Sequence, residues 1–202
     1  MAGTETSPTR SAFLELQDER QVVREGFEFL DEKRVILAQE MLRRLQDFQL
    51  ARDRYHAVHS QAVVAMSRAL GRHGLDGLEV YPPRRLTRFD LKLGQQPFLG
   101  VTLIDATVDL ATAPGTAPVN PSPEAGECAE RFAELARLGL DLAVQRACLE
   151  RLIAEYTRTE RRARALENVV LPEITESLEF INEQLEAVDQ EEAIRVRTAR
   201  QS

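Results

Sequence analysis

The stretch RALENVVLPEITESLEFINEQLEA, from Arg164 to Ala187, decides how the fold is interpreted. Its leucines, isoleucines and valines recur every three or four residues, which is the spacing of an amphipathic helix. Pro172 lies within that pattern, where a proline removes one backbone hydrogen bond and clashes with the preceding turn, at a cost of about 3 kcal/mol. The stretch therefore predicts a long helix in which something compensates for the proline.

Composition favours long helices over a compact globular core. The 202 residues are 43% hydrophobic and 29% charged, but only 5% aromatic, and tryptophan is absent. The net charge of -7 argues against nucleic acid as the main partner, because phosphate binding requires a basic surface. The first ten residues, MAGTETSPTR, have no apolar signal core, and no apolar run approaches the ~18 residues of a membrane span. We therefore expect a cytoplasmic protein without direct membrane insertion.

The first 70 residues predict one long helix. No proline occurs between Arg10 and Tyr81, and apolar residues form a stripe with steps of three and four, as a coiled-coil seam requires. The steps through Leu37, Met41, Leu45 and Phe48 are four, four and three, which predicts a local eleven-residue repeat. The stripe consists of Val23, Phe27, Leu30, Leu37, Met41, Leu45, Phe48, Tyr55, Ala62 and Met66.

A second long helix is predicted over residues 123–202. Its stripe consists of Phe132, Leu135, Leu142, Leu149, Leu152, Tyr156, Ala163, Leu166, Val170, Ile174, Leu178, Ile181, Leu185 and Val188. Each helix is preceded by a serine that can cap it and a proline at its first position, namely Ser7 with Pro8 and Ser122 with Pro123. Two such helices pack most simply as an antiparallel pair, which would place Val23 near Ile181.

Residues 71–122 differ in character from both helices. GRHGLDG ends the first helix, and alternating residues on either side of GQQP predict a β-hairpin with strands near Leu86–Leu93 and Phe98–Leu110. A proline-rich linker follows. The predicted fold is mainly α, a long antiparallel two-helix coiled coil with a small irregular or β-hairpin lobe in the middle of the chain.

The sequence offers little that could carry out chemistry. A phosphate-binding loop needs a lysine after a glycine-rich turn, and neither Lys33 nor Lys92 follows one. His56 and His59 could share a metal ion, but no third ligand lies nearby in the sequence. We therefore expect no catalytic, cofactor-binding or metal site. Arginines at 158, 161, 162 and 164 and the acidic residues of 173–192 form either solvated faces or contact surfaces.

Two segments resemble the signature helices of the D subunit, the central-stalk rotor component of V-type and A-type rotary ATPases. The first segment carries Pro8-Thr9-Arg10, and then Leu30, Lys33-Arg34 and Leu37. The second carries Arg161-Arg162, Ala165-Leu166-Glu167, Val170, Pro172, Ile174, Phe180-Ile181 and Arg195. A generic coiled coil would not contain RRARALENVVLPEI. The segments cover a little over a third of the chain.

The resemblance implies a non-catalytic shaft that couples ATP turnover in a ring of A and B subunits to proton or sodium transport in the membrane. It implies contacts with that ring at the end bearing the termini, for which the candidates are Pro8, Thr9, Arg10, Arg195 and Arg197. It further implies binding to the small F subunit and to the C (d) subunit, and hence peripheral membrane association.

Pro172 would set a fixed bend in such a shaft, unless the helix merely bulges there without consequence. Two other classes of protein also fit the helical pattern. They are a coiled-coil scaffold or tether, and the stalk of a secretion-system export ATPase, although such stalks are usually shorter and lack a strand-like middle. A metal enzyme built on His56 and His59 is the remotest alternative.

Overall fold

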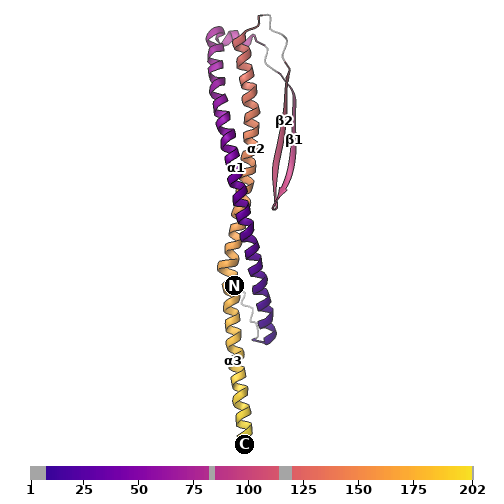
Figure 1. Ribbon diagram of the computed structural model, residues 1–202, viewed down its shortest axis with the longest axis vertical. Helices are drawn as coiled ribbons and strands as arrows, with labels where there is room; N and C mark the ends of the chain where they lie inside the picture. Colours follow the sequence, from indigo (N-terminus) through magenta and orange to yellow (C-terminus); the bar gives the residue numbers. More distant parts are fainter. Residues whose placement is uncertain (1–7, 82–84, 114–119, 202) are drawn as a thin grey trace. The chain divides into compact units, whose positions relative to one another are not determined.

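The computed structural model describes residues 8–81, 85–113 and 120–201, with side chains described outside 85–93, 105–113 and Gln201. Its elements follow in the order α1 (Arg10–Glu79), β1 (Arg85–Phe98), β2 (Val101–Ala113), α2 (Pro123–Ala165), the π-helical turn η1 (Leu166–Val170) and α3 (Leu171–Gln201) (Figure 1). The mainly α fold with a central hairpin is confirmed. The chain divides into a terminal unit, Met1–Ile36 with Tyr156–Ser202, and a middle unit, Leu37–Glu155.

The middle unit contains an antiparallel pair formed by α1 and α2. His73 near the end of α1 meets Ser122 just before α2, and a side chain added at Gly139 would touch the ring of Tyr55. The seam of α1 advances in alternating steps of four and three through positions that are buried or half-buried. They are Leu37, Met41, Arg44, Phe48, Ala51, Tyr55, Val58, Ala62, Ala65 and Ala69.

This seam corrects the predicted eleven-residue repeat. Leu45 is 40% exposed, and half-buried Arg44 takes the seam position instead. Met66 is likewise 42% exposed because Ala65 lies in the seam. The apolar pattern was misleading because a long arginine can cover a seam with its aliphatic stem while its charged end reaches solvent.

The terminal unit pairs the start of α1 with η1 and α3, again antiparallel. Gly26 faces Leu166, and Arg10 reaches Asp189 further along α3. Val23 therefore lies opposite residues near Leu171, and the predicted neighbour Ile181 is wrong. The register differs because a seam with steps of three and four presents a similar apolar face after one helix slides by two or three turns, so the stripe alone does not specify which residues pair.

The two helix starts differ from each other. Ser122 caps α2 as predicted, since its Oγ accepts the Ala125 N–H at 3.3 Å and Pro123 is the first helical residue. At α1 the cap is Thr9, whose Oγ1 accepts the Ala12 N–H at 3.2 Å. Pro8 precedes this cap instead of occupying the first helical position, and Ser7 lies outside the described residues.

Gly74 interrupts α1 near its C-terminal end. Its φ of 68° and ψ of 174° are not helical, yet helical structure resumes and continues to Glu79. The helix therefore extends past the predicted boundary at residue 70. This combination of angles is accessible essentially only to glycine.

Alanine substitutions at two neighbouring glycines are expected to have opposite effects on stability. Gly71 is helical with open space around its Cα, so Gly71→Ala should raise the free energy of unfolding by about 0.5–1 kcal/mol. Gly74→Ala should lower it by about 1–3 kcal/mol, because alanine is strained at a positive φ. Urea unfolding followed by circular dichroism measures both, and effects of the same sign would contradict the interruption at Gly74.

The hairpin turns at Leu99 and Gly100, with φ of 47° and 84°. Phe98 pairs with Val101, so these two residues form the loop and both adopt the positive φ of a type I′ turn. The predicted turn at GQQP is wrong, because residues 94–97 belong to β1 and pair with 102–105. The alternating pattern indicated strands correctly, but it did not reveal that a leucine would occupy a left-handed turn position.

The tip of the hairpin packs against α2 within the middle unit. Val101 and Leu103 are buried there. Arg151 donates to the carbonyl of Thr102 at 2.7 Å, and the Cys148 thiol donates to the carbonyl of Ile104 at 3.0 Å. Both cysteines of the chain are free thiols.

The π-helical turn immediately precedes Pro172. The N–H of Leu171 bonds to the carbonyl of Leu166, five residues back, which widens the helix by one residue. The seam shows the same extra residue, because its spacing becomes three successive steps of four. These steps run through Leu166, Val170, Ile174 and Leu178.

The widened turn explains why the helix tolerates the proline. Pro172 is the second residue of α3, and its ring would clash with a carbonyl four residues back only in a regular helix. The helix is already irregular at this point, because the seam contains one residue more than regular steps of three and four allow, and the π-turn accommodates that residue. We infer that the two irregularities coincide because one accommodates the other.

Candidate subunit-contact surfaces

The five residues expected at the end bearing the termini all lie in the terminal unit and are all exposed. Arg10 forms an ion pair with Asp189 at 3.2 Å, and Arg195 forms a weaker one with Glu191 at 3.7 Å. Arg197 is exposed two residues beyond Arg195, whereas Pro8 and Thr9 lie immediately before α1, with Thr9 as its cap. The structure thus connects Arg10 to α3 and leaves the other residues on open surface.

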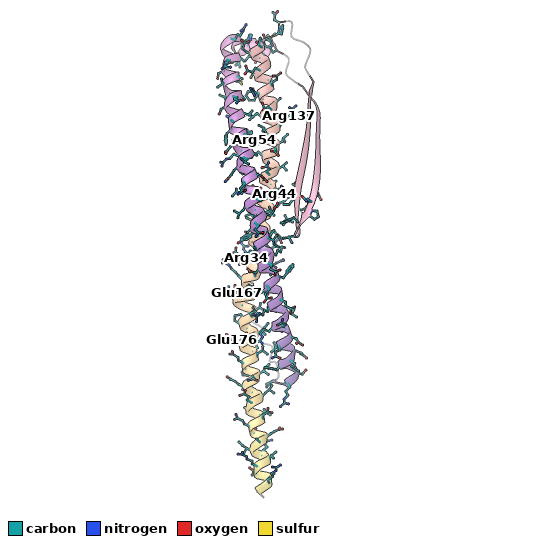
Figure 2. All side chains as sticks on the ribbon, viewed as in Figure 1. Arg34, Arg44, Arg54, Arg137, Glu167 and Glu176 are labelled. Atoms are coloured by element: carbon teal, nitrogen blue, oxygen red, sulfur yellow. The ribbon has the colours of Figure 1, made fainter. Side chains whose placement is uncertain are left out.

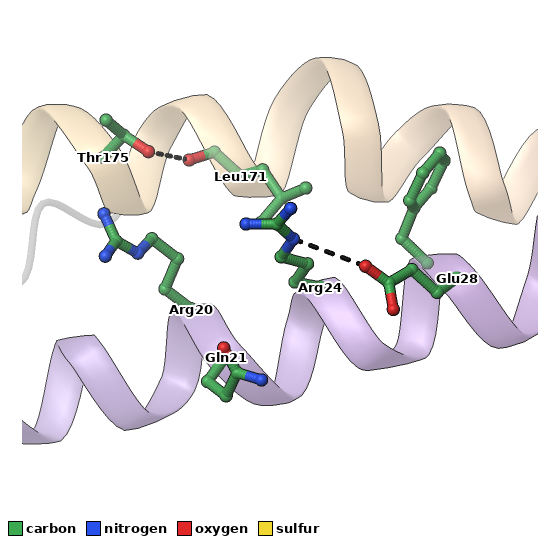
Figure 3. Close-up of a pocket in the computed structure, with 7 residues that line it drawn as sticks. Arg20, Gln21, Arg24, Glu28, Leu171 and Thr175 are labelled. Atoms are coloured by element: carbon green, nitrogen blue, oxygen red, sulfur yellow. Dashed lines mark hydrogen bonds and ion pairs between the residues drawn. The ribbon is translucent and has the colours of Figure 1, made fainter.

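A groove of about 510 Å³ lies between α1 and α3 in the terminal unit (Figure 3). One wall consists of α1 residues, including Arg20 and Arg24, and the other of Leu171 and Thr175. Thr175 Oγ1 donates to the Leu171 carbonyl at 2.7 Å, so its hydroxyl serves its own helix. The sequence pattern did not reveal the groove, because its two walls come from segments about 150 residues apart in the chain.

The middle unit carries an apolar stripe outside its seam. Each exposed member directly follows a buried or half-buried seam position on α1 or α2, and in an antiparallel pair these positions fall on the same side of both helices. On α2 these seam positions are Arg131 and Leu152, so the prediction that Phe132 lies in the seam is wrong. The stripe consists of Leu42, Leu45, Val63, Met66, Leu70, Phe132 and Ile153. Cys148 and Arg151, which contact the hairpin, directly precede seam positions and so lie on the other side.

A cluster of charges surrounds Glu40 in the middle unit. Its carboxylate accepts hydrogen bonds from Arg43 at 2.6 and 2.8 Å and from Arg44 at 2.9 Å (Figure 2 labels Arg44). These bonds, led by the one from Arg43, lower the pKa of Glu40 from 4.5 to about 2, although partial burial opposes the shift. The cluster fixes the long Arg44 side chain in its seam position.

Glu40→Gln should destabilise the chain at neutral pH but not in strong acid. Because the folded-state pKa lies below the unfolded value, the stabilisation is complete above about pH 4.5 and disappears as the pH falls towards 2. We expect a loss of about 1–2 kcal/mol at pH 7, discounted for the exposure of Arg43. Urea unfolding at several pH values measures this loss. Glu191→Gln, whose ion pair is exposed, is the control and should change stability by less than about 0.5 kcal/mol.

A second polar cluster connects the end of α1 to the start of α2. His73 Nε2 lies 2.7 Å from Ser122 Oγ, and Arg72 forms an ion pair with Glu124. The histidine–serine distance would suit a base and a nucleophile, but Ser122 already caps α2 and donates to Glu124 at 3.1 Å. The His73 ring also packs edge-on against the ring of Tyr81. The cluster therefore connects the end of α1 to the start of α2 and has a structural role.

The described residues show no group of three possible metal ligands. His56 and His59 are exposed and contact the ring of Tyr55. Among the described helices, none carries an apolar stretch long enough to cross a bilayer. The described residues form three kinds of surface, namely the charged groove of the terminal unit, the apolar stripe of the middle unit and exposed helix ends. Such a combination defines a class of helical subunits that work through contacts with other proteins.

Comparison with known proteins identifies the family. The family model that describes the D subunit of ATP synthase matches residues 12–201. The D subunit of the A-type ATP synthase of Methanoregula boonei is 27% identical over 201 residues, covering 98% of this chain and 96% of the relative. The D subunit of the V-type ATP synthase of Anaeromyxobacter dehalogenans strain 2CP-1 is 30% identical over 204 residues, covering 95% and 94%. The chain belongs to the family of ATP synthase D subunits, which confirms the resemblance seen in its two helical segments.

Proposed function

We propose that this chain is the central rotor shaft of a V-type or A-type rotary ATPase and couples ATP turnover in the head to ion transport in the membrane sector. The family match over residues 12–201 carries this proposal. The antiparallel pairing in each unit agrees with it, because a shaft that transmits torque needs continuous helices packed along a seam. Neither a tether nor an export-ATPase stalk has comparable support.

The chain itself supplies no catalytic group in this proposal. Its polar clusters are engaged in capping and ion pairing, as at Ser122 and Glu40. ATP is hydrolysed or made by the A and B subunits that surround the shaft. The purified chain alone is therefore expected to hydrolyse no ATP.

The surfaces suggest how the partners are distributed. The exposed residues Arg10, Arg195 and Arg197 would contact the ring of A and B subunits. The apolar stripe of the middle unit suits the small F subunit, because a protein partner would cover leucines and a phenylalanine that water otherwise surrounds. The C (d) subunit would then link the shaft to the membrane ring, making the chain a cytoplasmic, peripherally associated subunit.

Reconstitution with the head subunits tests the proposed function. The chain should bind at one copy per A–B ring and raise ATP turnover, and it should recruit the F subunit. Met66→Asp in the apolar stripe should abolish that recruitment while the binding to the ring persists. Self-association without binding to the ring would instead indicate a tether and overturn the rotor assignment.

A further inference from the structure

The groove of the terminal unit combines charge with an apolar floor. Arg20 and Arg24 lie one helical turn apart on α1, and both side chains extend towards α3 in Figure 3. Phe27 and Leu171 also line the groove and supply its apolar surface. The groove has a volume of about 510 Å³, which is large enough for two or three side chains of another protein. Those side chains must match both the charge and the apolar surface of the groove.

The two arginines are not equally neutralised. Arg24 Nε lies 3.4 Å from the Glu28 carboxylate, a long contact between exposed groups. The described part of the chain places no carboxylate within ion-pair distance of Arg20, even though the whole chain has a net charge of -7. The lining of the groove contains Glu28 as well as the two arginines, so it is positive by one charge, and the guanidinium of Arg20 is available for a further carboxylate.

We propose that this groove receives an acidic residue, flanked by an aliphatic one, from a subunit that surrounds the shaft. The inference rests on the proposed function, which places the terminal unit inside the ring. The carboxylate binds between Arg20 and Arg24, and the aliphatic side chain covers Phe27 and Leu171. Because the groove is present on one side of the unit, the contact marks one angular position of the shaft relative to the ring.

The position of the groove gives the π-turn a role in this contact. Leu171 and Thr175 follow η1 directly, so the extra residue of the turn sets which side of α3 faces Arg20 and Arg24. The same residue that preserves the seam therefore also positions the wall of the groove.

Binding of the full-length chain to the assembled A–B ring tests the proposal, using the double variant Arg20→Gln/Arg24→Gln. Its affinity for the ring at about 50 mM salt should fall on the order of tenfold for each arginine. Raising the salt concentration should weaken binding of the wild-type chain more than binding of the variant, because the screened charge pairs are absent from the variant. Arg20→Lys/Arg24→Lys keeps the charge and should recover part of the affinity.

The matched control is Arg54→Gln/Arg68→Gln, which removes two exposed charges from the same helix in the middle unit and should change affinity less than about twofold. Circular dichroism verifies that all variants remain helical. If the glutamine variant of the groove binds as tightly as this control, the groove proposal fails while the rotor assignment stands. If the wild-type chain does not bind the ring at all, both are wrong.

Discussion

Leu103→Asp is expected to detach the hairpin tip from α2 and to make Cys148 reactive. Leu103 is 2% exposed and Cys148 is fully buried, and the Cys148 thiol donates to the backbone of the residue next to Leu103. An isolated two-stranded hairpin is marginally stable in water, so it depends on this packing. A buried carboxylate without a partner costs several kcal/mol, more than the docked tip can compensate.

Thiol labelling measures the effect within a single chain. The Cys148 labelling rate should rise at least tenfold in Leu103→Asp and by a smaller factor in Leu103→Ala, which leaves a cavity worth about 2–5 kcal/mol. Cys128 provides an internal control, because it precedes Cys148 by 20 residues on α2, which is about 30 Å along the helix axis, and burial raises the pKa of its thiol.

Leu99→Asn is the matched control at the tip. Leu99 is exposed and adopts a positive φ, which asparagine tolerates better than leucine, so Cys148 should stay protected in this variant. Unchanged labelling of Cys148 in both Leu103 variants would show that the tip does not cover this thiol.

The sequence predicted the elements better than their alignment. Helical periodicity identified both long helices, and Ser122 with Pro123 marked the start of α2 correctly. The register was wrong because an apolar stripe repeats along each helix, so its period does not specify which residue of one helix faces which residue of the other. Leu45 and Met66 misled for a related reason, since apolar residues beside a seam look like seam residues until a partner face is known.

The candidate surfaces were only partly predictable. Arg10 and Arg195 were expected from the family resemblance, and both are exposed. The π-turn had a detectable signal, namely three successive steps of four in the apolar stripe, the second of which, from Val170 to Ile174, contains Pro172. The groove had none, because its arginines on α1 and its wall on α3 are about 150 residues apart in the sequence.

The question of why a long helix contains Pro172 leads to a second large expected effect. Deleting Asn168 removes the extra residue of the π-turn and would restore a regular helix, but with Pro172 inside it. The proline ring would then clash with the carbonyl four residues back, so we expect the deletion to cost about 3 kcal/mol or more. Pro172→Ala alone should change stability by less than about 1 kcal/mol, because the extra seam residue still requires the wide turn.

The double variant distinguishes this explanation from a simple kink. Deleting Asn168 in the Pro172→Ala background should recover most of the lost stability, since a regular helix no longer meets a proline ring. Urea unfolding of the wild type, the two single variants and the double variant gives the coupling free energy between the two changes. Nearly additive effects would contradict the explanation that the π-turn accommodates the proline. If the proline sets a bend that the rotor needs, Pro172→Ala should lower the coupled ATPase rate of the reconstituted complex despite its small effect on stability. An unchanged rate would mean that the wide turn serves the seam alone.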